Sequence, residues 1–335
     1  MKKLVCFGEM LLRFSPEMNG EWIRKNSIPV FVGGAELNVA TALAKWNLPA
    51  SYCTVLPKNA LAEDIVRDIS NKQIAIEKIF YSGDRIGSYY LPQGADLKNA
   101  GVIYDRAHSS FWNIQPGQLN WEEILKDAEW FHFTAITPAL NQNLADVCRE
   151  ALEYAKAKGI KISVDLNYRA KLWQYGKQPV EVMPELVQYA TLVMGNIWAA
   201  EKMLGIQMNP LTDSRESYLS QAEKTSASIM KKFPACKNVA NTFRFEMGEG
   251  VRYYATLYDG ISLFVSNELK TETIIDRIGS GDTFMAGLIY GVLTKKGAQE
   301  IIDFAAAAAF NKLFIKGDAT TSTVEEIMKG NIHYA

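Results

Sequence analysis

A single acidic residue follows a glycine-bearing loop in the segment TIIDRIGSGDTFMAGLIYG, residues 273–291. The pattern predicts a strand that ends at Asp276, a loop over Gly279, Ser280 and Gly281, and then a helix. Small residues at a helix N-terminus let backbone N–H groups approach an anion, and the helix dipole adds a favourable potential. No lysine follows the glycines as in a Walker A motif, and the spacing is not GxGxxG. The segment therefore predicts a phosphate-binding turn of another type.

Asp282, at the mouth of this turn, has two possible roles. Its negative charge makes it a poor phosphate binder, but a carboxylate there can accept the proton of a hydroxyl group that attacks a γ-phosphoryl group. The helix terminus is expected to lower the pKa of Asp282 and keep it ionised. Because Asp is also a favoured N-cap residue, the spacing alone leaves both the catalytic base and the helix cap open.

The middle of the chain has the pattern of a parallel, doubly wound sheet. Apolar residues recur at i, i+3 and i+4 over residues 141–158 and predict an amphipathic helix that ends at Gly159. A short apolar run, residues 130–136, precedes this helix, an alternating strand, 160–167, follows it, and a further strand is expected at 192–195. Strand–helix–strand units of this kind predict an α/β fold with a mostly parallel sheet flanked by helices.

Two stretches break this rhythm, at about residues 10–32 and 85–111. They carry aromatic and polar residues at strand-like spacing, with glycine turns between them. No internal repeat or linker-like run separates them from the rest of the chain. We expect them to form a small β-sheet lid inserted into one domain that spans residues 1–335.

Composition limits the classes of ligand and location. With 36 Lys and Arg against 37 Asp and Glu, the net charge of −1 favours neither nucleic acid nor an anionic membrane. The four cysteines are widely spaced and suggest neither a zinc site nor a disulfide framework. With only three histidines, a metal-ligand cluster or a His-based triad is not suggested either. No apolar run is long enough for a membrane span. A small-molecule ligand and a cytoplasmic location are expected.

The string GSGDTFMAG resembles the C-terminal signature GAGDxFxxG of the ribokinase (pfkB-type) family of carbohydrate kinases. Residues 33–49, GGAELNVATALAKWNLP, resemble the N-terminal signature of the same family. The strings RIGSYYL, VIYDRAHS and SVDLNYRA are similar to those of its 2-keto-3-deoxygluconate kinases. The resemblance implies a ribokinase-like fold with the small lid, ATP and Mg²⁺ as cofactors, a sugar-acid substrate and a homodimer formed through the lid. It leaves a monovalent cation open.

The resemblance also implies a role for individual residues. Asp282 would be the base, and the Gly279–Gly281 loop would form the anion hole. Arginine suits a planar carboxylate because it offers two parallel N–H donors. The implied substrate contacts are Gly34, Asn38, Tyr89, Tyr104, Arg106, Arg169 and Asp318, and the implied ATP contacts are Asn167, Asn196, Thr242, Gly279 and Gly281.

Residue type alone leaves ordinary structural roles open for several of these positions. Tyr104 and Arg106 share one face of a predicted strand, which could be an exposed surface. Arg169 follows the strand that ends at Asn167, where open α/β sheets bind ligands, but it could also form a surface salt bridge. Asp318 follows a glycine and could belong to a turn.

The sequence departs from the family pattern at two positions on the nucleotide side. An N-x-x-E acid is missing, because Ala199 stands three residues after Asn196. The usual Thr-Leu-Gly segment becomes Thr242-Phe243-Arg244. We expect an altered organisation of magnesium rather than a loss of activity. A kinase for another sugar such as fructose, and a non-catalytic sugar- or nucleotide-binding protein of the same fold, remain alternatives.

Overall fold

The computed structural model describes residues 3–17, 22, 27–93, 101–248 and 250–330. Its central sheet is parallel from one edge through its first seven strands and then continues in antiparallel strands. In spatial order the strands are β5 (Ile79–Tyr81), β4 (Ala50–Leu56), β1 (Lys3–Phe7), β8 (Ala128–Thr134), β9 (Lys161–Asp165), β10 (Leu192–Gly195), β11 (Asn238–Met247), β12 (Gly250–Tyr258) and β13 (Leu263–Val265), with β14 (Leu269–Thr271) paired to β12.

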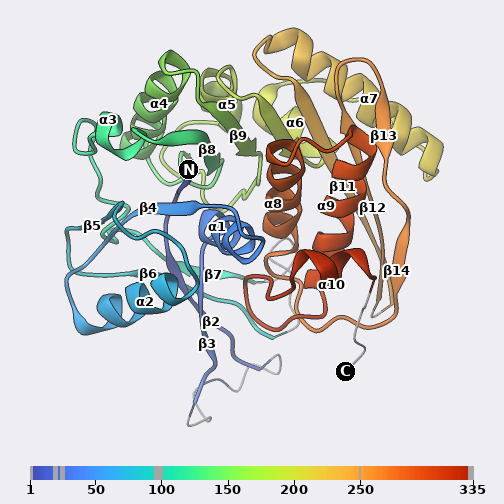
Figure 1. The fold of residues 1–335 in the computed structure, drawn as a ribbon. Helices are drawn as coiled ribbons and strands as arrows, with labels where there is room; N and C mark the ends of the chain where they lie inside the picture. The colour runs from blue at the N-terminus through green and yellow to red at the C-terminus, as the bar shows by residue number, and fades with distance from the viewer. Residues whose placement is uncertain (1–2, 18–21, 23–26, 94–100, 249, 331–335) are drawn as a thin grey trace.

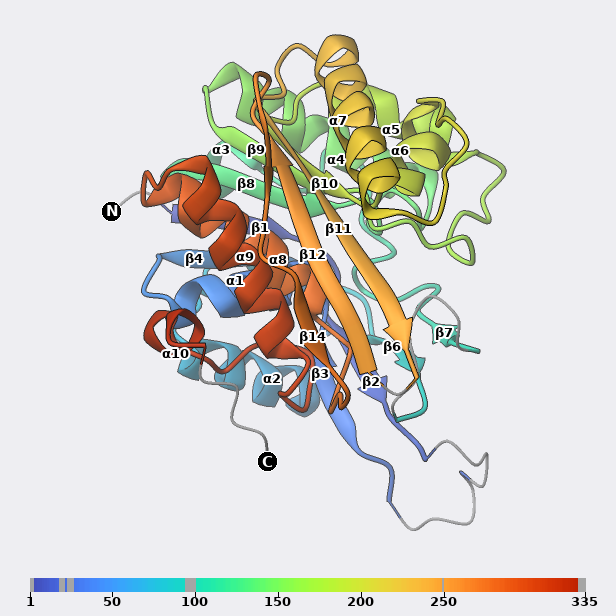
Figure 2. The same cartoon turned by 90° about the vertical axis from the view of Figure 1, so that its right-hand side faces the viewer.

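Helices cover both faces of this sheet in a three-layer arrangement (Figure 1, Figure 2). One face carries α1 (Ala35–Lys45), α2 (Ala60–Asn71), α8 (Ser280–Leu293), α9 (Ala298–Lys312) and α10 (Val324–Met328). The other face carries α3 (Trp121–Ile124), α4 (Gln142–Ala157), α5 (Pro179–Val187), α6 (Ile197–Leu204) and α7 (Arg215–Lys232).

The predicted strand–helix–strand unit is confirmed by β8, α4 and β9. α4 buries its apolar stripe, and the side chain of Asn141 caps its start by accepting a hydrogen bond from the backbone N–H of Leu144 at 2.9 Å. β8 and β9 pair in parallel with Phe131 opposite Ile162, and both residues are fully buried. Burial on both faces explains the apolar character of these strands.

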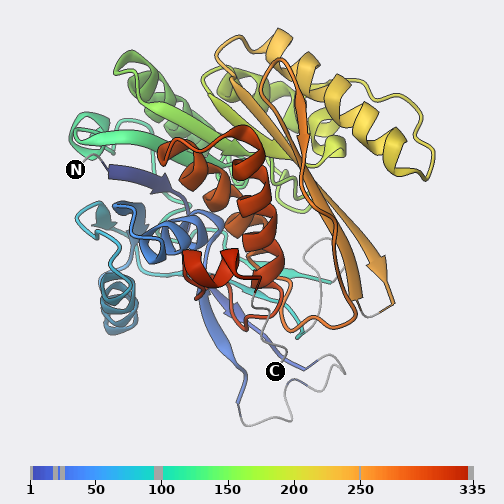
Figure 3. The ribbon, with the colours of Figure 1, turned by 45° about the vertical axis from the view of Figure 1, so that its right-hand side comes forward.

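A second, four-stranded sheet projects from the end of the central sheet (Figure 3). Its order is β3 (Val30–Gly33), β2 (Leu11–Phe14), β6 (Gly87–Tyr90) and β7 (Ile103–Asp105). The outer pairs are antiparallel and the β2–β6 pair is parallel. All four strands come from the two segments in which a lid was expected. Within those segments, residues 18–21, 23–26 and 94–100 lie outside the described residues.

The prediction of a strand that ends at Asp276 is wrong. β14 ends at Thr271, and the backbone N–H groups of Ile275 and Asp276 donate to the carbonyl oxygen of Leu313 at 2.8 and 3.1 Å. These bonds attach the segment to the turn after α9 rather than to a strand. The turn before α8 is therefore held by a part of the chain that is distant in sequence.

None of the helices in the described ranges combines the length and the apolar character needed to cross a bilayer. The four cysteines, Cys6, Cys53, Cys148 and Cys236, are buried free thiols.

Candidate active site

A cavity of about 220 Å³ opens at the carboxyl ends of β9 and β10, where α8 and the small sheet meet the central sheet. The backbone leaves each of these parallel strands at the same edge, so polar side chains that follow them converge there. Every residue that the family resemblance assigned to a site contributes to the lining: Gly34, Asn38, Tyr89, Tyr104, Arg106, Asn167, Arg169, Asn196, Thr242, Gly279, Ser280, Gly281, Asp282 and Asp318.

The N-terminus of α8 points into this cavity with glycine as its N-cap. Gly279 has φ +78°, in the left-handed region, and a Cβ atom there would overlap the carbonyl oxygen of Asp318. Ser280 ties the first turn of α8 to α9, because its hydroxyl donates to the carbonyl oxygen of Ala309 at 2.8 Å. The first turn thus presents unpaired backbone N–H groups, which suit an anion.

Asp282 does not cap the helix. Gly279 occupies the N-cap position, and Asp282 lies in the first turn with its Oδ2 accepting a hydrogen bond from Asn38 Nδ2 at 2.7 Å. Asn38 comes from α1, so the two family signatures meet here. The cap interpretation is therefore wrong, and the carboxylate is free to face the cavity.

The expected lowering of the pKa of Asp282 is also wrong. Burial raises it to about 7, against the opposing effects of Asn38 and Arg169, and the nearby Asp165 raises it further. The favourable potential at a helix N-terminus is smaller than the cost of removing a carboxylate from water. A group with a pKa near neutrality is better suited to accept a proton than an ordinary aspartate.

Two arginines from different elements reach the cavity, in different surroundings. Arg106 lies just beyond the end of β7, is 4% exposed, and forms an ion pair with Glu9 at 2.6 Å. Arg169 is half-buried, donates to the carbonyl oxygen of Tyr168 at 3.1 Å, and lies close enough to Asp282 to affect its pKa. Arg106 does not lie on an exposed surface, so that ordinary interpretation is wrong for it, whereas the surface salt bridge stays an alternative for the half-buried Arg169.

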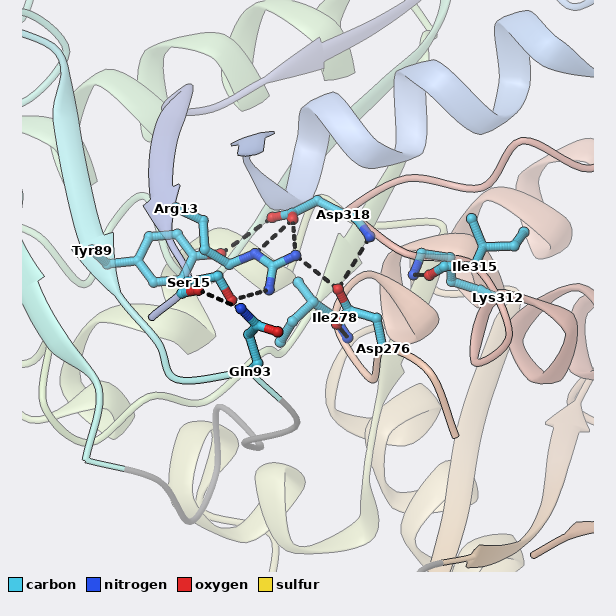
Figure 4. A network of polar contacts seen from close by, with 10 residues as sticks. Arg13, Ser15, Tyr89, Gln93, Asp276, Ile278, Lys312, Ile315 and Asp318 are labelled. Atoms are coloured by element: carbon cyan, nitrogen blue, oxygen red, sulfur yellow. Dashed lines mark hydrogen bonds and ion pairs between the residues drawn. The ribbon is translucent and has the colours of Figure 1, made fainter. Parts of the chain in front are cut away.

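Asp318 and Tyr89, which line the cavity, also belong to a charged network around Arg13 (Figure 4). The carboxylate of Asp318 accepts from Arg13 Nε at 2.8 Å and from the Tyr89 hydroxyl at 3.2 Å. Arg13 also pairs with Asp276 at 2.8 Å, and Asp276 accepts from the backbone N–H of Gly317 at 3.1 Å. Arg13 therefore joins β2 of the small sheet to the turns on either side of the α8 N-terminus.

The side of the cavity lined by Asn196 and Thr242 contains residues that were not predicted from the sequence. Arg244 and Arg277 line it, and both pair with Glu246, at 3.3 and 2.6 Å. Asn196 caps α6 by accepting from the backbone N–H of Ala199 at 2.7 Å, which leaves its amide nitrogen for other contacts. The position of Arg277, two residues before the glycine loop, was a signal available in the sequence.

Glu36 and Glu9 were likewise missed. Glu36 lies in the first turn of α1, is 2% exposed, and accepts hydrogen bonds from the backbone N–H and the hydroxyl of Thr134 at 2.9 and 2.7 Å. Burial raises its pKa to about 7. Neither acid lines the cavity, and no spacing rule predicts their surroundings, because their partners Thr134 and Arg106 come from distant segments.

Comparison with known proteins gives consistent matches. Residues 1–323 match the pfkB family of carbohydrate kinases. The chain is 28% identical over 331 residues to the 2-dehydro-3-deoxygalactonokinase of Haloferax volcanii, covering 98% of this chain and 97% of that protein. It is 36% identical to the crystal structure of 2-dehydro-3-deoxygluconokinase from Thermotoga maritima, with a TM-score of 0.89 and coverage of 98% and 99%. A putative Ribokinase II from E. coli in complex with ATP and Mg²⁺ shares the fold at 17% identity, with a TM-score of 0.78 and coverage of 98% and 99%.

Proposed function

The chain belongs to the pfkB family of carbohydrate kinases, and on this basis we propose that it transfers the γ-phosphoryl group of ATP to the primary hydroxyl of 2-keto-3-deoxygluconate, giving the 6-phosphate. One observation carries the proposal. A carboxylate with a raised pKa, Asp282, lies beside the glycine turn of α8 in a cavity that also contains Arg106 and Arg169. This combination provides a base, an anion hole and two cations that can bind a carboxylate.

In the proposed reaction Asp282 accepts the proton of the primary hydroxyl as its oxygen attacks the γ-phosphorus. The bond to the β-phosphate oxygen breaks and ADP leaves. Asn38 orients the carboxylate through its 2.7 Å hydrogen bond. The N–H groups of the Gly279–Gly281 turn stabilise charge on the transferring oxygens, which is the main contribution a protein makes to phosphoryl transfer.

We assign the sugar acid to the side of the cavity formed by the small sheet and the loop after β9. Arg169 is the stronger candidate for the substrate carboxylate, because the charge of Arg106 is already balanced by Glu9. Tyr89, Tyr104 and Asp318 line the same side and offer hydroxyl and carboxylate groups to sugar hydroxyls. Gly34 and Asn38 complete this side of the site.

ATP is assigned to the opposite side, with Asn167, Asn196 and Thr242 beside the glycine turn. Arg244 and Arg277 add positive charge there, which suits the phosphates of a nucleotide. In the described residues, no group of three or more His, Cys, Asp or Glu side chains could hold a metal ion. Magnesium would bind here through the phosphates and water, which is its usual mode, and would neutralise phosphate charge.

A kinase assay with a panel of substrates tests this function. Purified protein is incubated with Mg-ATP and 2-keto-3-deoxygluconate, 2-keto-3-deoxygalactonate, fructose or ribose, and ADP release is measured. We expect kcat/KM for the keto-acids to exceed that for fructose at least a hundredfold, and NMR of the product to place the phosphate on O6. A preference for fructose would contradict the proposed substrate. Fructose is the relevant competitor because plant fructokinases of 25% identity also match this chain.

We also propose that the small sheet is a lid that forms a homodimer. Its edge strands β3 and β7 carry the exposed side chains of Val30 and Ile103, at 49% and 51% exposure. Apolar strand edges favour pairing with another strand. Size-exclusion chromatography with light scattering should give twice the 37.5 kDa mass of the chain, and a mass equal to one chain at micromolar concentration would contradict this.

A further inference from the structure

Lys312, the last residue of α9, is the most deeply buried cation in the described part of the chain. Its relative exposure is 0%, and its ammonium donates to the carbonyl oxygen of Ile315 at 2.8 Å. The methylene next to the ammonium lies 3.6 Å from where a Cβ atom at Gly279 would be. The charge therefore lies close to the N-cap of α8 and is buried, and Figure 4 shows its bond to Ile315.

The groups that face Lys312 are acidic. Asp276, Asp318 and Asp282 each favour the charged form of Lys312, while Arg13 opposes it. Asp276 and Asp318 share the single guanidinium of Arg13, with contacts of 2.8 Å to both. Two carboxylates against one guanidinium leave one negative charge, and the nearby positive charge of Lys312 opposes it. Without Lys312 that charge would stand behind a site that receives a polyphosphate, where it would repel the ligand.

A role in packing alone does not explain a lysine at this position. An ammonium is costly to bury, and an apolar side chain of similar length fills the same volume without that cost. The groups that contact Lys312 belong to two neighbouring turns: Gly279, where the anion hole begins, and Ile315, in the turn at residues 315–318. The ammonium holds the turn at residues 315–318 through the carbonyl oxygen of Ile315, the side chain packs beside Gly279, and the charge adds positive potential near the N-terminus of α8.

We propose that Lys312 is a positioning residue for phosphoryl transfer, a built-in cation whose ammonium holds the anion hole in place and makes the reaction independent of any free monovalent cation. The inference rests on the proposed kinase function and extends it to the cation question that the sequence left open. Lys312 would not touch the phosphates itself. Its charge would act on them through Gly279 and the turn around Gly279.

The wild-type protein provides the first test, because it needs no variant. Turnover with a saturating accepted sugar is measured at constant ionic strength in tetramethylammonium, sodium, potassium and ammonium chloride. We expect kcat to vary less than twofold among these salts. A tenfold or larger activation by potassium or ammonium would overturn the proposal, because the site would then take its cation from solution.

Variants test whether the charge itself matters. In Lys312→Met we expect kcat to fall at least thirtyfold, with less than a threefold change in KM for the sugar and with the circular dichroism spectrum retained. In Lys312→Ala we expect a similar loss and at least a fivefold recovery on adding potassium, ammonium or methylammonium, which can enter the vacated space. Turnover within threefold of wild type in both variants, or a Lys312→Ala turnover that no small cation raises, would contradict the proposal.

Two further measurements separate this inference from the sugar assignment. The affinity for a non-hydrolysable ATP analogue, measured by calorimetry without sugar, should fall at least threefold in Lys312→Met, and an unchanged affinity would count against a cation behind the anion hole.

Burial lowers the pKa of Lys312 to about 8, so kcat/KM should decline above pH 8 in the wild type. In Lys312→Arg, which stays charged, that decline should move to higher pH. A wild type that phosphorylates fructose but not the keto-acid would end the substrate proposal and leave the inference about Lys312 intact.

Discussion

Replacing Asp282 by asparagine should stop catalysis while making the fold more stable at neutral pH. The two carboxylic oxygens become one oxygen and one NH₂ group of the same size, so the shape of the cavity is kept. Loss of a general base typically costs 10²–10⁴ in rate. We therefore expect kcat to fall at least a hundredfold while binding of the sugar and of an ATP analogue changes by less than threefold.

The expected stabilisation follows from the raised pKa. Asp282 has a pKa of about 7 in the folded protein, against 3.8 as its ordinary value. The unfolded chain loses the proton more readily, so the folded state is penalised as pH rises from about 4 to 7, and the penalty is complete above pH 7. The full shift corresponds to about 4 kcal/mol. Because the carboxylate faces an open cavity, we expect about 1–2 kcal/mol, or a rise in Tm of roughly 2–4 °C.

Differential scanning fluorimetry from pH 4 to 8.5 measures this effect. The gain in Tm of Asp282→Asn over wild type should be near zero at pH 4 and largest at pH 8. Asp64→Asn is a matched control, because Asp64 is a 74% exposed aspartate on α2 whose replacement should change neither turnover nor Tm. The reasoning is refuted if Asp282→Asn retains more than a tenth of the wild-type kcat, or if its Tm is unchanged or lower at pH 8.

Three other replacements probe the surrounding residues. Gly279→Ala should reduce kcat at least a hundredfold and lower the free energy of unfolding in urea by about 1–3 kcal/mol, because of the positive φ and the overlap with the Asp318 carbonyl. Normal turnover would contradict the anion-hole role. In steady-state assays, Arg169→Met should raise KM for the keto-acid roughly 10- to 100-fold, the effect of losing a charged hydrogen bond, while KM for ATP stays unchanged. An unchanged KM for the keto-acid would assign the substrate carboxylate to Arg106 instead. Arg13→Met should lower the free energy of unfolding by about 3–5 kcal/mol, because it strands Asp276 and Asp318, and a loss below 1 kcal/mol in urea titration would show that Lys312 alone balances them.

Local patterns in the sequence were sufficient for most of the elements and for the glycine turn before α8. The amphipathic helix at 141–158, the strand at 192–195 and the helix that starts at Ser280 depend on periodicity, capping and glycine, which act over a few residues. The prediction of a strand before Asp276 was wrong because β propensity by itself does not show whether a neighbouring strand is present to pair with the segment. That segment bonds to Leu313 instead, and no local rule contains this information.

Electrostatic properties were decided by the tertiary structure. Whether Asp282 has a lowered or raised pKa depends on how much water the fold removes and on Asp165, Asn38 and Arg169, which come from three other segments. The same holds for the ammonium of Lys312, whose surroundings form only when the turns at 276–279 and 315–318 meet. The sequence therefore determined which chemical groups the site contains, whereas the folded chain determined their charges, because burial and long-range pairing set the free energy of ionisation.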